Sequence, residues 1–210
     1  MNKVSMVDIN VPKTSRINKN KKQQGVALLE LIIAIGIIGI LTAAVVSLAS
    51  NAFASMNAKE VIQNTSQIKT GISGVYGRTG DYTNIGQPAG GGGGLDAQAF
   101  TMQDLSNPFG AELKVEETMW ASVPAKGYVV IIPQLPAKQC ADIVNQIGTS
   151  WAYVEIANDS TAPPTDISGV AATENIVYVD GNDEFFTPGY IGQACGDEGS
   201  PNKTVYLGAR

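Results

Sequence analysis

The stretch VALLELIIAIGIIGILTAAVVSLA, residues 26–49, decides the fold of this 210-residue chain. One carboxylate, Glu30, interrupts it, and the following 28 residues carry no charge until Lys59. A helix needs about 20 apolar residues to cross the hydrocarbon core of a bilayer. The stretch is therefore long enough to span a membrane. A secretory signal peptide has a shorter apolar region and a small-residue cleavage site. Ala52 and Ala54 mimic such a site, but the helical pattern continues through them.

Charge is distributed unevenly on the two sides of this stretch. Residues 1–25 contain six Lys or Arg and one acid, whereas residues 26–210 contain eight Lys or Arg and 18 Asp or Glu. The positive-inside rule keeps the basic N-terminal flank, which includes Lys21 and Lys22, in the cytoplasm. We therefore expect the acidic remainder of the chain to be exported.

The composition argues against several functional classes. The sequence has no His, which excludes a Ser-His-Asp triad, a Cys-His pair and most catalytic zinc sites. The net charge of −5 argues against binding to nucleic acid. We therefore predict no enzyme activity, no catalytic or metal-ligating residue and no cofactor. A membrane-anchored exported enzyme is the least favoured alternative.

Apolar residues continue at helical spacing beyond the charge-free stretch. Five of them form one stripe, with spacings of 4, 3, 4 and 3 residues: Val61, Thr65, Ile68, Ile72 and Val75. The Thr79-Gly80-Asp81 segment should end the helix. The pattern predicts one helix over residues 26–78, about 80 Å long at 1.5 Å per residue. Its first half would lie in a membrane or another apolar environment, and its second half on a globular head.

Glu30 needs an explanation, because a carboxylate in hydrocarbon costs at least about 2.5 kcal/mol and is usually paired. No Lys or Arg follows within 28 residues. Glu30 therefore either reaches the aqueous interface or pairs with another chain. If the chain were cut after Gly25, the new ammonium group of Val26 in one copy could meet the Glu30 carboxylate of its neighbour.

The segment KKQQGVALLE, residues 21–30, together with the apolar helix after it, resembles the prepilin signature of type IV pilins. The long leader and Val at position 26 resemble the type IVb subgroup, which includes toxin-coregulated and bundle-forming pilins and the thin-pilus pilins of conjugative systems. Further similar segments, at residues 107–113, 128–140 and 195–206, extend the resemblance over nearly the whole mature chain.

This resemblance implies cleavage after Gly25 and N-methylation of Val26 by a prepilin peptidase, with Glu30 guiding methylation and subunit docking. It divides the chain into a cleaved leader (residues 1–25), a transmembrane and assembly helix (26–54) and a globular pilin head (55–210). Any melting of the helix in a filament should centre on Gly36 and Gly39, which are the weak helix formers there.

The resemblance further implies the major subunit of a type IVb pilus, used for adhesion, cell aggregation or conjugative mating contact. A minor pilin or a type II secretion pseudopilin is the alternative. The implied location is the inner membrane for the prepilin and then an extracellular pilus (fimbrium) of a Gram-negative bacterium. The implied partners are other copies of the chain, the peptidase, an inner-membrane assembly platform and a host or recipient cell surface.

The remaining pattern predicts an α+β head, in which an antiparallel sheet packs on the long helix with short helices beside it. Residues 79–94, with five consecutive glycines, read as a connecting loop. Short helices are predicted at 95–105 and 136–147. Strands are predicted at 113–116, 127–132, 151–156, 175–179 and 203–207. Residues 180–186 are predicted to form a turn, with or without a second hairpin strand after it.

Three smaller groups of residues complete the predictions. Cys140 and Cys195 should form a structural disulfide in an exported domain, closing a loop of 55 residues and contributing about 4 kcal/mol. Acids after residue 179 read as a polar turn rather than a calcium site, because Phe185 replaces the glycine that an EF-hand needs. Two Trp and two Phe are predicted to pack in the core or an interface: Trp120, Trp151, Phe185 and Phe186.

Overall fold

The structure is a computed structural model, and it divides the chain into two compact units, Met1–Ala49 and Ser50–Arg210. It describes residues 23–83, 85–86, 105–158, 162–179, 181–196 and 202–210. Most of the predicted leader, the glycine run and the predicted helix 95–105 lie outside these ranges, apart from Leu105, which forms part of a turn.

Helix α1 covers Gln23–Tyr76, so the long helix predicted from the sequence is confirmed, with each end shifted by two or three residues. The chain leaves the helix in a left-handed turn at Gly80, whose φ is +57°. There the Gly80 N–H donates to the Tyr76 carbonyl oxygen at 2.8 Å. A glycine accepts this backbone conformation without the steric penalty that a side chain would bring.

The predicted apolar stripe of α1 is buried in the head. Val61, Thr65, Ile68 and Ile72 are completely buried, and Val75 is half-buried. Val61, Ile68 and Ile72, with Val75 against them, pack in one core cluster with side chains from the sheet, including Tyr128 of strand β2. This packing explains why α1, with two glycines in its last turns, stays helical up to Tyr76.

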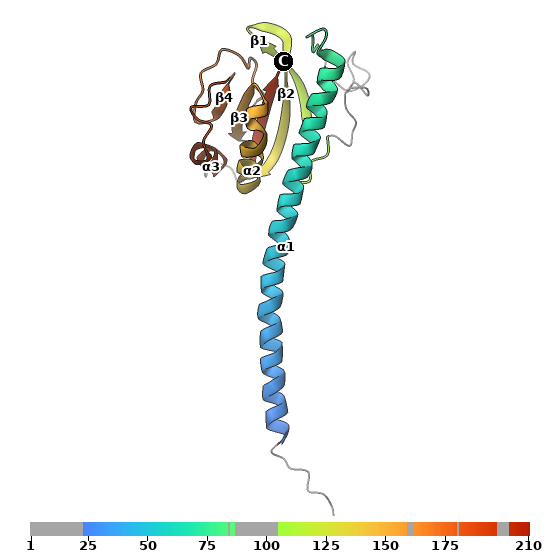
Figure 1. Cartoon of the computed structure of the whole chain (residues 1–210), viewed down its shortest axis with the longest axis vertical. Helices are drawn as coiled ribbons and strands as arrows, with labels where there is room; N and C mark the ends of the chain where they lie inside the picture. Colours follow the sequence, from blue (N-terminus) through green and yellow to red (C-terminus); the bar gives the residue numbers. More distant parts are fainter. Residues whose placement is uncertain (1–22, 84, 87–104, 159–161, 180, 197–201) are drawn as a thin grey trace, which may run out of the picture. The chain divides into compact units, whose positions relative to one another are not determined.

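The sheet has five antiparallel strands in the order β1-β2-β5-β3-β4 (Figure 1). The last strand in sequence, β5, therefore lies in the middle. The bounds are β1 (Lys114–Trp120), β2 (Val123–Pro136), β3 (Tyr153–Asn158), β4 (Ile176–Val179) and β5 (Asn202–Ala209). All five predicted strands are present, and β1, β2 and β5 are longer than predicted.

Strand β2 reads as a continuous apolar run because both of its faces are covered. Tyr128 and Val130 point into the cluster that contains α1, whereas Val129 and Ile131 join a second cluster on the opposite face. Ile167, from the segment before β4, is fully buried in this second cluster. The strand predicted at 127–132 is therefore confirmed, and both of its faces are buried.

Two helices and a single 3-10 turn follow β2. Helix α2 covers Ala137–Ile147 and buries the predicted face, which includes Cys140, Ile143 and Val144. Pro136 is the last residue of β2, with extended backbone, so its predicted place in the first helical turn is wrong. The 3-10 turn, Gly148–Ser150, leads to the buried Trp151.

Helix α3, Pro188–Gly196, was not predicted and packs beside α2 (Figure 1). The disulfide between Cys140 and Cys195 links the two helices, with 5.8 Å between their Cα atoms. Both cysteines are buried. The predicted pairing is therefore present, and it holds a glycine-rich helix against the core.

The segment after β4 forms a turn without a second hairpin strand. The Asn182 N–H donates to the Val179 carbonyl oxygen at 2.8 Å, and the Glu184 N–H donates to the Asn182 side chain at 3.1 Å. Asp180 lies outside the described residues. Phe185 and Phe186 pack on the main core, as predicted for them.

Candidate processing and assembly site

The predicted processing site lies in the first turns of α1. Gly25 and Val26 have helical backbone, and the Val26 side chain is 66% exposed. Glu30 follows Val26 by four residues, which is about one helical turn, so the two side chains share a face of the helix. The structure thus brings Val26 and Glu30 to the same accessible edge of α1.

Glu30 is exposed and has no hydrogen-bond or ion-pair partner among the residues that the structure describes. In water such a carboxylate is solvated. When the helix enters an apolar environment, the carboxylate loses this water and needs a cation or a set of donors. Glu30 is therefore the position on this apolar surface where a polar group has to contact the helix.

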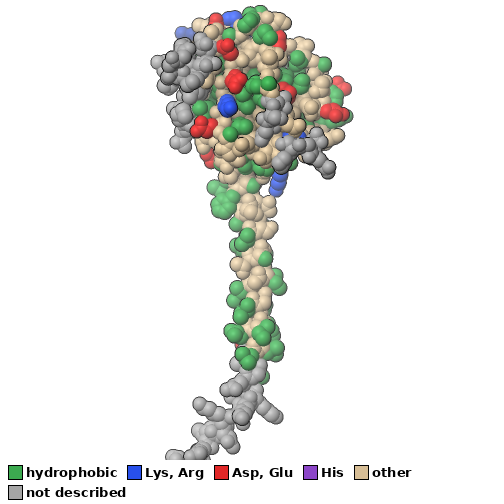
Figure 2. All heavy atoms as spheres, turned by 180° about the vertical axis from the view of Figure 1, so that it is seen from behind, with side chains coloured by type: hydrophobic (Ala, Val, Ile, Leu, Met, Phe, Trp, Pro, Cys, Tyr) green, Lys and Arg blue, Asp and Glu red, His purple; other side chains and the backbone are tan. Residues whose placement is uncertain are grey.

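Around Glu30, α1 is apolar on every side. Consecutive positions on a helix point about 100° apart, and here consecutive large side chains such as Leu28 and Leu29, or Ile37 and Ile38, are all exposed. Figure 2 shows hydrophobic side chains along this part of the helix. Sixteen exposed large hydrophobic residues lie between Val26 and Met56: Val26, Leu28, Leu29, Leu31, Ile32, Ile33, Ile35, Ile37, Ile38, Ile40, Leu41, Val45, Val46, Leu48, Phe53 and Met56.

This surface is incompatible with free exposure to water. Full burial of a large aliphatic side chain contributes about 1.5–3 kcal/mol, so the whole set represents a large driving force for transfer to lipid or for packing with other helices. The helix is long and apolar enough to cross a membrane, by length and composition. It is also suited to a helical bundle, because both environments bury all sides of it.

Small and hydroxylated residues modify the apolar surface. A Cβ added at Gly36 or Gly39 would meet no atom within 4 Å, so these positions leave room for the backbone of another helix. The Thr42 hydroxyl donates to the Ile38 carbonyl oxygen, which satisfies its donor within the helix. The predicted melting at the two glycines concerns the filament and stays a prediction.

Three features of the head that sequence reasoning missed are α3, the segment around Ile167 and a small pocket beside α3. The signal for α3 is present in the i, i+3, i+4 spacing of Ile191, Ala194 and Cys195, all of them buried. Gly189 and Gly192 mask this signal, because each costs about 1 kcal/mol of helix propensity relative to Ala. The pocket is lined by α3 and by the loop before β4, and no motif marks it in the sequence.

Comparison with known proteins connects this geometry to one class of protein. The prokaryotic N-terminal methylation motif matches residues 20–46, which contain Gly25, Val26 and Glu30. A toxin coregulated pilin of Vibrio cholerae serotype O1 is 26% identical over 155 residues, which are 71% of this chain and 69% of that pilin. A second toxin coregulated pilin of Vibrio cholerae is 24% identical over 144 residues, which are 66% of this chain and 64% of that pilin.

Among solved structures, the chain resembles the crystal structure of TcpA, a type IV pilin from the Vibrio cholerae El Tor biotype. The TM-score is 0.62 with 17% identity, and the match covers 74% of this chain and 99% of that one. The fold is therefore the type IV pilin fold: a long N-terminal helix, an antiparallel sheet and one disulfide in the C-terminal half. The resemblance to type IV pilins found in the sequence is confirmed.

Proposed function

We propose that this chain, a type IV pilin-like polypeptide, is the precursor of the major structural subunit of a type IVb pilus. Two features of α1 support the proposal. The N-terminal methylation motif spans residues 20–46, and the helix that begins there is apolar on every side. The observation that carries it is the placement of one carboxylate, Glu30, a single turn into that apolar surface and without a partner among the described residues.

In this proposal, a prepilin peptidase of the inner membrane cuts the chain after Gly25 and methylates the new amino group of Val26. The apolar part of α1 then lies in the bilayer until assembly begins. During assembly the helix leaves the bilayer and packs among the α1 helices of other copies, which replace lipid as its apolar surroundings.

Glu30 sets the register of this packing. In a core of apolar helices, an unpaired carboxylate would lose its water without compensation, and breaking a buried ion pair costs about 3–5 kcal/mol. The Val26 ammonium group of a neighbouring copy supplies the opposite charge. Registers of the helix packing that leave Glu30 unpaired are disfavoured by the cost of this unpaired charge. Many registers would bury the apolar side chains equally well, so the ion pair selects one of them.

Outside the cell, the assembled heads form the pilus surface. We propose that this fimbrium mediates adhesion, aggregation or conjugative mating contact with a host or recipient cell. Assembly draws on an inner-membrane platform, and the cell is Gram-negative. A minor pilin or a type II secretion pseudopilin would share the motif and the fold but would be scarce in the filament, so the composition of sheared filaments separates these roles.

The central test is Glu30→Gln, which keeps the size of the side chain and removes its charge. We expect the precursor to be cleaved as in the wild type, and the number of filaments seen by electron microscopy to fall at least tenfold. The matched control is Glu116→Gln, an exposed carboxylate on β1, which should leave filaments unchanged. Normal numbers of filaments with Glu30→Gln would overturn the proposed pairing.

A second test concerns the processing site. The intact mass of the subunit from sheared filaments should correspond to residues 26–210 with one added methyl group. Gly25→Ala should still be cut to some degree, whereas a bulky residue at position 25 should leave the uncut precursor on a gel. If the dominant filament protein is a different chain, this protein is a minor pilin or a pseudopilin instead.

A further inference from the structure

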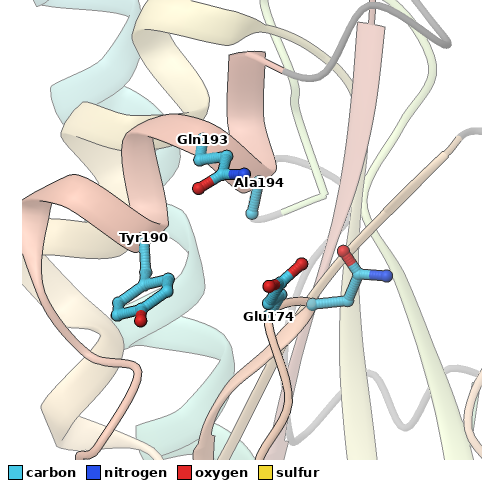
Figure 3. A pocket seen from close by; sticks show the side chains of 5 residues that line it. Glu174, Tyr190, Gln193 and Ala194 are labelled. Carbon is cyan, nitrogen blue, oxygen red and sulfur yellow. The ribbon is translucent and has the colours of Figure 1, made fainter.

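We propose that the pocket between α3 and the loop before β4 binds an uncharged hexose or N-acetylhexosamine unit of a glycan. The pocket has a volume of about 190 Å³ and is lined by Glu174, Asn175, Tyr190, Gln193 and Ala194. Figure 3 shows Tyr190 and Gln193 extending from α3, with Glu174 facing them from the loop. One monosaccharide fits this space, whereas a longer oligosaccharide would extend out of it into solvent.

The polar groups of the pocket match the chemistry of sugar hydroxyls. A hydroxyl group donates and accepts hydrogen bonds at the same time, and the pocket offers both functions. Glu174 supplies only acceptors, whereas Asn175 and Gln193 supply an amide donor and an amide acceptor each. An alkylammonium group, which only donates, would leave the amide donors unmatched. The mixed set therefore favours a polyhydroxylated ligand.

These polar groups are available for a ligand. The side chains of Glu174, Asn175 and Gln193 have no hydrogen-bond partner within the part of the chain that the structure describes. A ligand would therefore not have to break internal hydrogen bonds. A charge-assisted bond from a hydroxyl to the Glu174 carboxylate is the strongest contact that the site can make.

Tyr190 supplies the apolar wall. Its side chain is 39% exposed, and it is one of two large hydrophobic residues of the described head beyond α1 with this degree of exposure, the other being Val123. Phe185 packs against the Tyr190 ring at 71°, with 5.0 Å between the centroids. The electron-rich face of an aromatic ring attracts the polarised C–H groups of a pyranose. An exposed aromatic ring beside amide and carboxylate groups suits the C–H faces and the hydroxyl groups of a sugar.

The helix that carries Tyr190 and Gln193 is held in place by the core. Tyr190 and Gln193 are three residues apart on α3, so both lie on the same face of the helix. Between them, Ile191 is fully buried, and Cys195 ties the helix to α2 through the disulfide. A preorganised site loses less conformational entropy on binding, which matters for a ligand that makes few contacts.

The charge of the sequence on both sides of the lining residues indicates which sugars can bind. Residues 139–202 contain ten Asp or Glu and no Lys or Arg, so they account for the whole net charge of −10 of residues 26–210. This potential repels carboxylated sugars such as sialic and uronic acids. It leaves neutral hexoses and N-acetylhexosamines as the favoured ligands.

The binding itself needs only a folded head, while its role in adhesion rests on the proposed function. The test is therefore made on the full chain in detergent micelles, without filaments. Saturation-transfer difference NMR is recorded with the methyl glycosides of glucose, galactose, mannose and N-acetylglucosamine, and with N-acetylneuraminic acid. We expect transfer to at least one neutral glycoside, with a Kd of about 1–10 mM, and none to N-acetylneuraminic acid.

Three variants locate the site. Tyr190→Ala and Gln193→Ala should each weaken binding at least fivefold, and Glu174→Gln should weaken it about threefold or more. The matched control is Glu184→Gln, which removes one exposed charge outside the pocket and should leave the Kd within a factor of two. Thermal unfolding of each variant shows that the head is intact.

Three results would overturn the proposal. The first is no transfer to any neutral glycoside with a folded wild-type chain. The second is binding that the three pocket variants leave unchanged. The third is equal binding of N-acetylneuraminic acid, which would contradict the charge argument. Loss of filaments in the Glu30→Gln variant would not affect any of these outcomes, so the two proposals fail separately.

Discussion

Asp166 shows how one carboxylate stabilises a strained turn. The β1–β2 hairpin turns at Ala121 and Ser122, whose φ values of 52° and 59° are rare for residues other than glycine. The Asp166 carboxylate accepts the N–H groups of Ser122 at 2.9 Å and Ser168 at 3.0 Å, and the Ser168 hydroxyl accepts the N–H of Ala121. The segment 166–168 therefore stabilises the hairpin turn, although Ala121 and Ser122 themselves do not favour the backbone conformation of that turn.

These hydrogen bonds make the turn sensitive to acid. The N–H groups of Ser168 and then Ser122 hold the pKa of Asp166 below its usual value. A group with a lowered pKa in the folded state stabilises the fold above its unfolded pKa of about 3.9 and loses this contribution as pH falls. We expect Asp166→Asn to lower the thermal midpoint at pH 7 by a few degrees and to have a smaller effect at pH 3. An equal effect at both pH values would contradict this explanation.

Glu155 on β3 should behave in the opposite way. Burial on the sheet face raises its pKa, although Tyr153 donates a hydrogen bond to its carboxylate at 2.7 Å. A carboxyl group with a raised folded pKa favours folding when protonated, and this contribution is lost as pH rises from the unfolded value through the folded one. Glu155→Gln keeps an acceptor for Tyr153 and has no charge. We expect this variant to match the wild type near pH 4 and to be more stable at pH 7, as measured by thermal unfolding. If the variant were less stable than the wild type at pH 7, the claim that the buried Glu155 carboxylate destabilises the fold at this pH would be wrong.

At the scale of elements, the sequence predicted the helices that bury residues at a regular spacing. The buried stripe of α1 and the buried face of α2 both follow the 3.6-residue repeat of a helix. Strand β2 could be recognised from its β-branched run. The segment with Ile167, which covers the second face of β2, could not be recognised, because its residues have no regular repeat. The central place of β5 also has no local signal, since strand order is decided by long-range pairing.

Helix α3 is the element that we expect to depend most on the disulfide. It contains Gly189 and Gly192, and its covalent link to α2 compensates for their low helix propensity. We expect the variant Cys140→Ala/Cys195→Ala to lose about 4 kcal/mol of stability to unfolding. Amide hydrogen exchange should increase first in residues 188–196, with β2 and β5 still protected. Unchanged protection of α3 would mean that packing around Ile191 holds the helix without the covalent link.

For the candidate site, the sequence located the residues but not their surroundings. Gly25, Val26 and Glu30 could be identified because the motif and the apolar run are local in sequence. The pocket could not be identified from the sequence, because Glu174 and Tyr190 come from different elements. They come together through the packing of α3, which is linked to α2 by the disulfide.

At the scale of the whole molecule, the two compact units have opposite solvent requirements. The unit Ser50–Arg210 buries its own core, whereas Met1–Ala49 exposes most of the large apolar side chains of α1. We therefore expect a truncated chain of residues 50–210 to be a soluble, folded monomer with the disulfide intact, while the full chain needs detergent or lipid. Sedimentation velocity at micromolar concentration and circular dichroism measure both properties. The midpoint of thermal unfolding should lie within a few degrees of that of the full chain in micelles, because the stripe from Val61 to Ile72 is retained. A truncated chain that is unfolded, or that assembles as the full chain does, would show that residues 23–49 contribute to the fold of the head as well as to assembly.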